Sequence, residues 1–429
     1  MWTRWRAWIP LLGGTLLLLS AVCAGAEDGL PAAPSGRVEL LHYWTGALDG
    51  GIREMVEAFN RENRGNAVTA TGLEHETFKV GILSRLSSGE GTDIFSYWAG
   101  AKVQALVNAG YLEPLDGVWQ QDRLEQRFTP AVSAACVYNG HPYAIPVTQH
   151  FVAFFYNKKL FASLGLTPPA TWKEFLEVCE RIKASGATPI AIGTRERWPA
   201  QFWFDYLLLR TAGPHYRQAL MEGAKAYTDP EVKRAFTLWR QLLDTGAFNA
   251  SPEKDDWAGA AASVRNGRAA MTLMGTWIIG HYHGDPACRE GVEYDFFTFP
   301  VIDADVPLVA LGPIDVLVAS RRGNVQEAQK ALAYFAGVKP QEAMSRGSGA
   351  LAPNTRVPGE AYSEMKRRIL AATYASPYWA FNYDLATPPP VADVGLGSFC
   401  AFMKQPERLD ALLQSMRQRV ESYFSQSNP

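Results

Sequence analysis

Short apolar runs alternate along the chain with stretches in which apolar residues recur every three or four positions. The run 38–43 predicts a strand, and the residues after it recur at helical spacing: Ile52, Met55, Val56 and Phe59. The runs 67–73 and 93–97 predict two further strands. An order of strand, helix and strand predicts an α/β fold built on parallel sheets.

The same patterns continue through the second half of the chain. Asp229 and Pro230 begin a predicted helix that Gly246 ends, with an apolar face made of Ala235, Phe236, Trp239, Leu242 and Leu243. Further elements are expected over 264–274, 296–301 and 312–319. From residue 325 to the C-terminus the pattern is mostly helical.

The first 26 residues are typical of an export signal. Arg4 and Arg6 precede an apolar stretch over 9–22 that is short for a membrane span, and small residues at 24–26 predict cleavage there. A lipoprotein modified at Cys23 is the weaker alternative, because the residue before it is not small. We therefore expect a soluble mature protein in the periplasm.

Length and charge restrict the classes of function. Removing 26 of the 429 residues leaves 403, and single cores stop growing at about 250–300 residues, so two or more lobes are expected. The formal net charge of −2 comes without a basic cluster, which argues against nucleic acid or an anionic membrane as partner. Four cysteines follow the signal, and their spacing selects none of the three possible disulfide pairings: Cys136, Cys179, Cys288 and Cys400.

A hinge-like pattern stands between the predicted strands. Residues 143–150 form an extended run in which Pro146 removes a backbone donor, and an apolar strand over 151–156 follows. Thr171 then stands at an N-cap position, with Glu174 as its capping-box partner. In this order, after an export signal, the features resemble the extracellular solute-binding proteins (family 1 type) of ABC sugar importers.

The resemblance implies a fold and a function. The fold is α/β and periplasmic-binding-protein-like (type II), with two α/β lobes, a hinge and a ligand cleft between them. The expected lobes are discontinuous, with 37–147 plus 305–347 in one and 150–300 plus 352–429 in the other. The implied protein is a monomeric receptor, not an enzyme, which binds a sugar without a cofactor and delivers it to membrane permease subunits.

Polar and aromatic residues follow the predicted strands, where ligands collect in open α/β sheets. Sugars need this mixture, because the C–H face of a pyranose packs on aromatic rings while its hydroxyls need polar partners. The candidate ligand-binding residues are Tyr43, Trp44, Thr45, Glu74, His75, Trp98, Gln149, His150, Trp257, Trp277, Asp315, Arg346 and Trp379.

Three motifs are similar to those of the family branch that takes glucose-like monosaccharides. They are the strand end 42–45, the hinge 146–150 and the turn 274–277, and the same alignment puts Trp257, Asp315 and Arg346 on contact positions. The chain departs from the branch at Ser96 and Trp98, where more polar side chains are expected, and no His stands near the prolines at 388–390. These departures leave open which sugar, monosaccharide or small oligosaccharide, is bound.

Each candidate has a structural alternative. Asp315 interrupts an apolar strand, and a buried carboxylate without a partner is costly, so a ligand role is favoured, with Arg346 as a neighbour. His150 is nearly as well explained by a bond to the backbone at the hinge, and Arg346 by a solvated loop charge. His281 and His283 lie on one side of an expected extended segment, but with no acidic or Cys cluster around them no metal site is expected.

Two other classes of function are compatible with a cleft of this composition. A secreted glycoside hydrolase needs two opposed carboxylates, a role that Glu74 and Asp315 could fill. A receptor of the same fold for a polyamine or another small cation would use the aromatic rings and the same two carboxylates, and Arg346 in the cleft would count against it.

Overall fold

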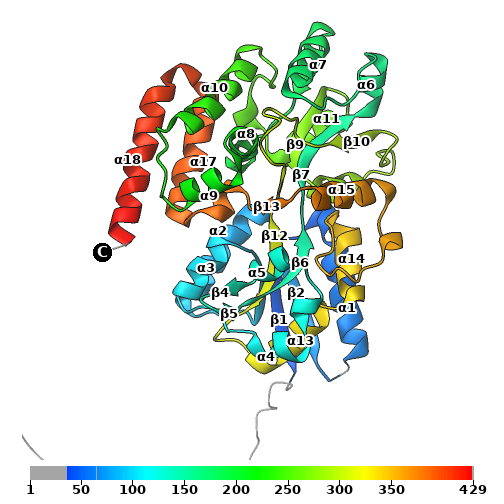
Figure 1. Cartoon of the computed structure of the whole chain (residues 1–429). Helices are drawn as coiled ribbons and strands as arrows, with labels where there is room; N and C mark the ends of the chain where they lie inside the picture. Colours follow the sequence, from blue (N-terminus) through cyan, green and yellow to red (C-terminus); the bar gives the residue numbers. More distant parts are fainter. Residues whose placement is uncertain (1–35, 64, 428–429) are drawn as a thin grey trace, which may run out of the picture. The chain divides into compact units, whose positions relative to one another are not determined.

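The computed structural model describes residues 36–63 and 65–427, so the export signal predicted for residues 1–26 lies outside the described residues. Two separate sheets form the framework, each with its own hydrophobic core (Figure 1). We call the part around the five-stranded sheet the first lobe and the part around the four-stranded sheet the second lobe. No helix in the described part of the chain is long and apolar enough to cross a membrane.

The sheet of the first lobe has the strand order β2-β1-β3-β12-β6. Its strands are β1 (Arg37–His42), β2 (Ala67–Gly72), β3 (Ile94–Trp98), β6 (Ala144–Gln149) and β12 (Ile314–Ala319). β1 pairs in parallel with β2 and β3, as strands joined by crossover helices do, whereas β12 is antiparallel to both β3 and β6. The predicted parallel pairing is present for β1 with β2 and β3 but does not extend to the whole sheet, because β12 enters it from the second lobe and runs the opposite way.

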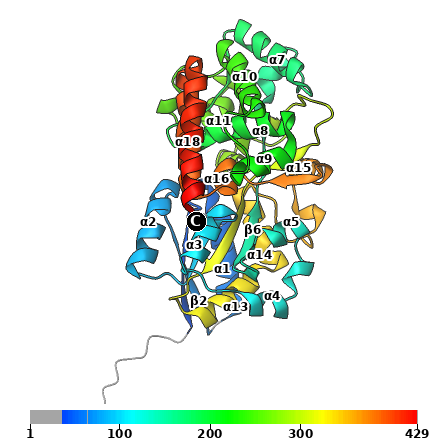
Figure 2. The ribbon, with the colours of Figure 1, turned by 60° about the vertical axis from the view of Figure 1, so that its left-hand side comes forward.

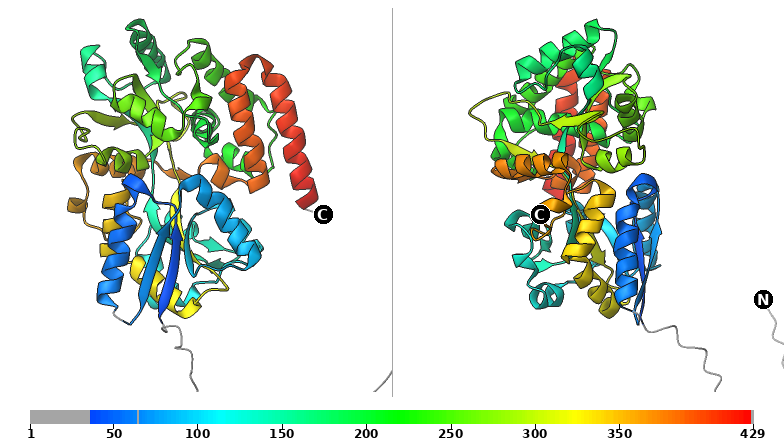
Figure 3. Two further views of the ribbon diagram at one scale, coloured as in Figure 1. Left: turned by 180° about the vertical axis from the view of Figure 1, so that it is seen from behind. Right: turned by 90° about the vertical axis from the view of Figure 1, so that its right-hand side faces the viewer.

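Helices cover both faces of this sheet (Figures 2 and 3). They are α1 (Gly50–Glu62), α2 (His75–Ser88), α3 (Ala101–Asn108), α4 (Asp116–Gln121), α5 (Pro130–Ala134), α13 (Val325–Phe335) and α14 (Val338–Ser348). α1 buries Ile52, Met55, Val56 and Phe59, the residues whose spacing predicted it. α1 and α14 approach closely where a side chain on Gly347 would meet the backbone of Gly51.

The sheet of the second lobe has the order β10-β7-β9-β8, and only β8 and β9 are parallel. Its strands are β7 (Val152–Asn157), β8 (Thr188–Ile190), β9 (Ala269–Gly275) and β10 (Tyr294–Phe297). The main helices around it are α6 (Lys158–Ser163), α7 (Trp172–Ala184), α8 (Gln201–Thr211), α9 (Gly213–Met221), α10 (Pro230–Asp244), α11 (Trp257–Arg265), α12 (Trp277–His283), α15 (Glu364–Ala375), α16 (Tyr383–Ala386), α17 (Pro389–Lys404) and α18 (Leu409–Ser427).

Several predicted elements of the second lobe are present and others differ. The capping box of Thr171 and Glu174 begins α7, and Trp239 is fully buried on α10. The range 264–274 holds the end of α11, which closes at Arg265, and most of β9, which begins at Ala269 after a turn. The segment of His281 and His283 is helical in α12 rather than extended.

The chain crosses between the lobes in segments that bond to one another. Gln149 and Leu351 exchange two backbone hydrogen bonds of 2.9 Å, and the His150 N–H donates to the Pro313 carbonyl at 3.0 Å. Gly312 packs so closely that a Cβ would lie 1.8 Å from the His150 carbonyl oxygen, which excludes any side chain there. A small two-stranded sheet of β11 (Val309–Leu311) and β13 (Tyr378–Ala380) adjoins this crossing.

Candidate functional site

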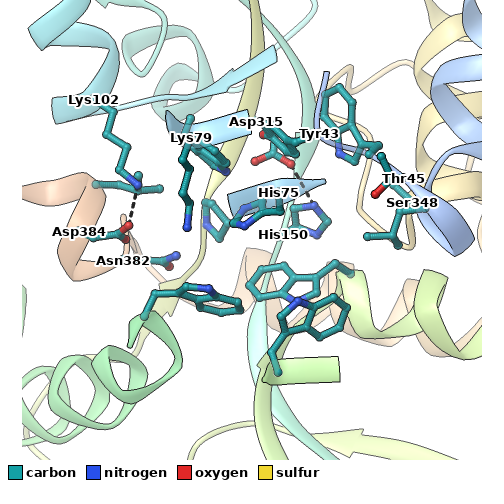
Figure 4. A pocket seen from close by; sticks show the side chains of 18 of the residues that line it. Tyr43, Thr45, His75, Lys79, Lys102, His150, Asp315, Ser348, Asn382 and Asp384 are labelled. Atoms are coloured by element: carbon teal, nitrogen blue, oxygen red, sulfur yellow. Dashed lines mark hydrogen bonds and ion pairs between the residues drawn. The ribbon is translucent and has the colours of Figure 1, made fainter. Parts of the chain in front are cut away.

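A cavity of about 210 Å³ lies where the strand ends of the first lobe face helices and loops of the second (Figure 4). It is smaller than the roughly 300–1,000 Å³ of sites for drug-sized ligands. Ten of the thirteen predicted ligand residues line it: Tyr43, Trp44, Thr45, Glu74, His75, Trp98, His150, Trp257, Trp277 and Asp315. The predicted residues make up half of the twenty that line the cavity, and several of them come from the ends of strands, where ligands collect in open α/β sheets.

Aromatic rings form much of the wall. In the first lobe Tyr43 stacks on Trp98, with ring centroids 4.4 Å apart and planes 9° from parallel. In the second lobe Trp198 and Trp277 meet edge to face at 5.8 Å, and Trp277 also contacts the ring of His150 at 5.2 Å. Rings from both lobes thus offer flat apolar faces to the cavity.

Asp315 stands at the centre of a hydrogen-bonded group at the hinge. Thr148 Oγ1 donates to Asp315 Oδ2 at 2.6 Å, and His150 Nε2 lies 3.2 Å from the same oxygen. His150 Nδ1 contacts Thr276 Oγ1 at 2.9 Å, so this imidazole joins the strand of Asp315 to the second lobe. Burial, together with the nearby Asp315 carboxylate, raises the pKa of Tyr43 well above its ordinary value. The expectation that Arg346 neighbours Asp315 is wrong, since protein groups within the hinge surround this carboxylate.

Two lysines, which the sequence did not single out, reach the cavity from the first lobe. Lys102 Nζ lies 2.7 Å from Asp384 Oδ2 of the second lobe and 4.8 Å from the centre of the Trp98 ring. Lys79 Nζ lies 2.7 Å from Glu76 Oε1. Burial, and then the repulsion of Lys102, lowers the pKa of Lys79. Burial alone would raise the pKa of Asp384, but the Lys102 ammonium holds it below its ordinary value.

Glu74 also has a structural partner. Its carboxylate caps the N-terminus of α2, accepting from the backbone N–H groups of Glu76 and Thr77 at 3.0 Å. Burial opposes ionisation of Glu74, but these backbone donors lower its pKa overall. The charged groups at the cavity are therefore satisfied within the protein.

Two buried polar atoms on the wall make no hydrogen bond within the described part of the chain. They are the indole Nε1 of Trp198 and the amide Oδ1 of Asn382, on side chains that are 8% and 5% exposed as whole residues. One is a donor and the other an acceptor. Buried polar groups are nearly always hydrogen-bonded, so a water or a ligand hydroxyl at the cavity would complete both atoms.

Three predicted ligand residues do not line the cavity. Arg346 lies in the last turn of α14, where it is exposed and pairs with Glu54 and Glu342 at 2.6 and 3.2 Å. Gln149 uses its backbone to bond Leu351 at the crossing. Trp379 lies in β13 and packs against the cores of both lobes.

The remaining wall residues were not predicted. Trp198 and Gln201 stand at and after a short 3-10 turn, and Asn382 and Asp384 lie at the start of α16; the others are Leu48, Lys79, Lys102, Pro313, Ser348 and Leu385. Trp198 follows β8 by eight residues, so the search past strand ends could have found it. Asp384 follows the short strand β13, which the sequence did not predict, and nothing local in the sequence marks this residue.

The wall combines stacked rings, an unpaired donor, an unpaired acceptor and charges that are already paired. It suits an uncharged ligand with both C–H faces and hydroxyls. In the described part of the chain no group of three or more His, Cys, Asp or Glu residues is arranged to hold a metal ion. The four cysteines expected in the mature chain are free thiols.

Both the sequence and the fold are similar to those of known proteins. The sequence profile of the bacterial extracellular solute-binding proteins matches residues 45–342. An uncharacterised ABC transporter extracellular-binding protein of Pyrococcus horikoshii is 25% identical over 380 residues, 84% of this chain and 83% of its own length. A multiple sugar-binding protein of Streptococcus mutans is 24% identical over 349 residues, 77% of this chain and 79% of its own length.

Among solved structures, the bacterial solute receptor AcbH superposes with a TM-score of 0.85 at 24% identity, covering 91% of this chain and 99% of the receptor. AcbH has an exclusive substrate preference for β-D-galactopyranose. At this identity the likeness establishes the fold, which is the two-lobed type II fold expected from the sequence.

Proposed function

Because the chain belongs to the bacterial extracellular solute-binding proteins, we propose that it is the sugar receptor of an ABC importer. Like its relatives, it is a binding protein and not an enzyme. Its family places it outside the cytoplasmic membrane. In the proposal the predicted signal directs it to the periplasm, where it works as a monomer that passes its sugar to the permease subunits.

One observation carries the proposal: the cavity offers aromatic faces together with the unpaired Trp198 Nε1 and Asn382 Oδ1. A pyranose supplies both complements, an apolar C–H face for the rings and hydroxyls that donate and accept. Leaving these two atoms unpaired in a closed cleft costs about 1–3 kcal/mol each, which favours a ligand able to satisfy them.

The proposed ligand is a glucose-like monosaccharide, or one terminal unit of a small oligosaccharide. The cavity volume of about 210 Å³ supports a small ligand. Tyr43 and Trp98 of the first lobe and Trp277 of the second line this cavity, so a single pyranose can contact rings of both lobes. The S. mutans relative is named for binding multiple sugars and AcbH for a single hexose, so both sizes occur among similar proteins.

Binding is proposed to act through lobe closure. The lobes are taken as 37–147 plus 305–347 and 150–300 plus 352–429, and the crossings at Gln149 and Leu351 fall at two of these boundaries. A sugar that contacts Tyr43 in one lobe and Trp277 in the other gains its full set of contacts only when the lobes meet. It therefore favours the closed form by differential affinity, and the permease distinguishes that form.

The charges at the cavity argue against a cationic ligand. A polyamine needs free carboxylates, but Asp315 contacts His150 and Thr148, and Glu74 caps α2. Lys79 and Lys102 also stand at the wall and would repel a cation.

A thermal-shift screen against mono- and disaccharides tests the proposal. A sugar at about 100 times its dissociation constant should add roughly 2.7 kcal/mol to the free energy of unfolding and raise the melting temperature. Spermidine at the same concentration is the control and should leave the melting temperature unchanged. A shift with spermidine and with none of the sugars would refute the sugar assignment.

A further inference from the structure

The segment Phe381–Asp384 of the second lobe reaches across to the first lobe at one end of the cavity. Asp384 pairs there with Lys102, and Asn382 points its amide, whose oxygen is unpaired, toward the same space (Figure 4). Leu385, the next residue, is buried in the core of the first lobe. Its carbonyl oxygen lies so close to Gly100 that a Cβ there would be 2.3 Å away. The position of this segment therefore decides the shape of the cavity wall.

Side chains of α8 and α9, rather than a sheet, hold the backbone of this segment. Asp205 Oδ2 accepts from the Tyr383 N–H at 2.8 Å, and Arg217 Nη2 donates to the Phe381 carbonyl at 2.7 Å. Gln201 Oε1 accepts from the Asp384 N–H at 2.8 Å. These three hydrogen bonds, at Phe381, Tyr383 and Asp384, thus fix the backbone on both sides of Asn382.

Asp205 and Arg217 also pair with each other out of contact with water. Arg217 Nε and Nη2 donate to Asp205 Oδ1 at 2.8 and 2.6 Å, and the two side chains are 0% and 2% exposed. Neither residue lines the cavity. A buried ion pair is a weak source of stability, because desolvation offsets its attraction and an apolar pair of similar volume often does as well. What this pair does that apolar residues could not do is hold two polar backbone groups in fixed positions.

We propose that Asp205 and Arg217 are positioning residues for ligand binding, which act by holding Asn382 and Asp384 at the cavity. The inference rests on the proposed function, since it concerns the affinity of the same site. Asp205 fixes the position of the Tyr383 N–H, and Arg217 fixes the position of the Phe381 carbonyl. The backbone of Asn382 lies between these two groups, so its side chain is held in the direction of a ligand hydroxyl.

Two variants and a matched control separate positioning from plain stability. Asp205→Asn keeps the shape and removes the charge that binds Arg217. Arg217→Lys is the milder second variant, which keeps the charge but loses the two-pronged contact with Asp205. Phe402→Leu is the control: Phe402 is fully buried in the same core, where its ring meets Phe236 edge to face and Trp239 at a tilt, away from the segment.

D-Glucose, D-galactose and maltose are titrated calorimetrically into each protein, well below its melting temperature. For every sugar that wild type binds, both positioning variants should lose affinity by about tenfold or more. A loss of this size corresponds to one hydrogen bond between the protein and the ligand. The control should bind as wild type does. Combining Asp205→Asn with Asn382→Ala should weaken binding no further than Asn382→Ala alone, because both act on one contact.

Hydrogen exchange gives a readout that needs no sugar. The amides of Tyr383 and Asp384 should exchange faster in Asp205→Asn and at the wild-type rate in Phe402→Leu. Normal affinity in both positioning variants, despite faster exchange, would overturn the inference and leave the proposed function intact. Failure of wild type to bind any of the three sugars, or any in the wider screen, would overturn the proposed function and the inference with it.

Discussion

His150 Nε2 lies 3.2 Å from Asp315 Oδ2, and this contact joins the segment that crosses into the second lobe with a strand of the first. The Asp315 carboxylate also accepts a hydrogen bond from Thr148, so two side chains of the hinge bind it. Asp315 therefore both borders the cavity and fixes the crossing, two roles that the sequence had presented as alternatives.

Asp315→Asn should lower the free energy of unfolding of the sugar-free protein. The amide keeps the shape but weakens bonds to a charged acceptor, each worth about 1.5–3 kcal/mol, and urea denaturation measures the loss. Asp393→Asn is the matched control, because Asp393 is exposed and pairs only with exposed Arg197. Equal urea midpoints for the two variants would show that the hinge does not depend on the Asp315 charge.

Trp257→Ala should weaken sugar binding by about 1–3 kcal/mol without unfolding the protein. Trp257 is half-buried at the start of α11 and its ring borders the cavity. In contrast, Trp239→Ala should cost about 3–5 kcal/mol of stability, because Trp239 is fully buried on α10. Titration calorimetry and thermal melts on both variants test the pair, and normal sugar affinity in Trp257→Ala would remove that residue from the site.

Arg346→Ala should leave sugar affinity unchanged. The guanidinium is exposed and pairs with Glu54 of α1 and with Glu342 one turn earlier in α14, so the free energy of unfolding should change by no more than about 1 kcal/mol. A drop in affinity measured by titration would return Arg346 to the ligand role that the sequence suggested.

Lys366 makes stability depend on pH in the alkaline range. Burial lowers its pKa to about 8 from 10.5, while its ammonium donates to the Ser345 carbonyl at 2.6 Å, with Glu290 and Arg346 as the charged neighbours. Between pH 8 and 10.5 the unfolded chain holds this proton more tightly than the folded chain, so this residue adds stability as the pH rises.

The measurement is the difference in free energy of unfolding between wild type and Lys366→Met at several pH values from 7 to about 10.5. The difference should shift in favour of wild type by up to about 3 kcal/mol across this window. Loss of the bond to Ser345 adds a constant offset that does not vary with pH. A difference that is flat with pH would mean that Lys366 is neutral, or solvated, in the folded protein.

Local patterns in the sequence predicted what local interactions determine. The spacing of Ile52, Met55 and Phe59 predicted α1, and the pairing of Thr171 with Glu174 predicted the start of α7. The same holds for Tyr43 and Trp98, which reach the cavity because each follows or ends a strand.

Contacts between segments that are distant in the sequence could not be predicted from local patterns. Lys102 and Asp384 are 282 residues apart, and neither has neighbours that mark it as part of a site. The family resemblance placed Arg346 at the site, whereas in the structure it lies in the last turn of α14 and its guanidinium pairs with Glu54 of α1. The direction of β12 depends on the path through the second lobe, which periodicity does not describe.

The place of β12 between β3 and β6 has a consequence for how the chain folds as it is made. β3 and β6 end by residue 149, but the strand that joins them begins at Ile314. At about 5–20 residues per second, synthesis of the intervening segment takes on the order of ten seconds or more. Until then both strands keep an unpaired edge, a state prone to wrong pairing. The N-terminal part cannot complete its sheet ahead of the rest, so the molecule acquires its native structure late, after most of the second lobe has been synthesised.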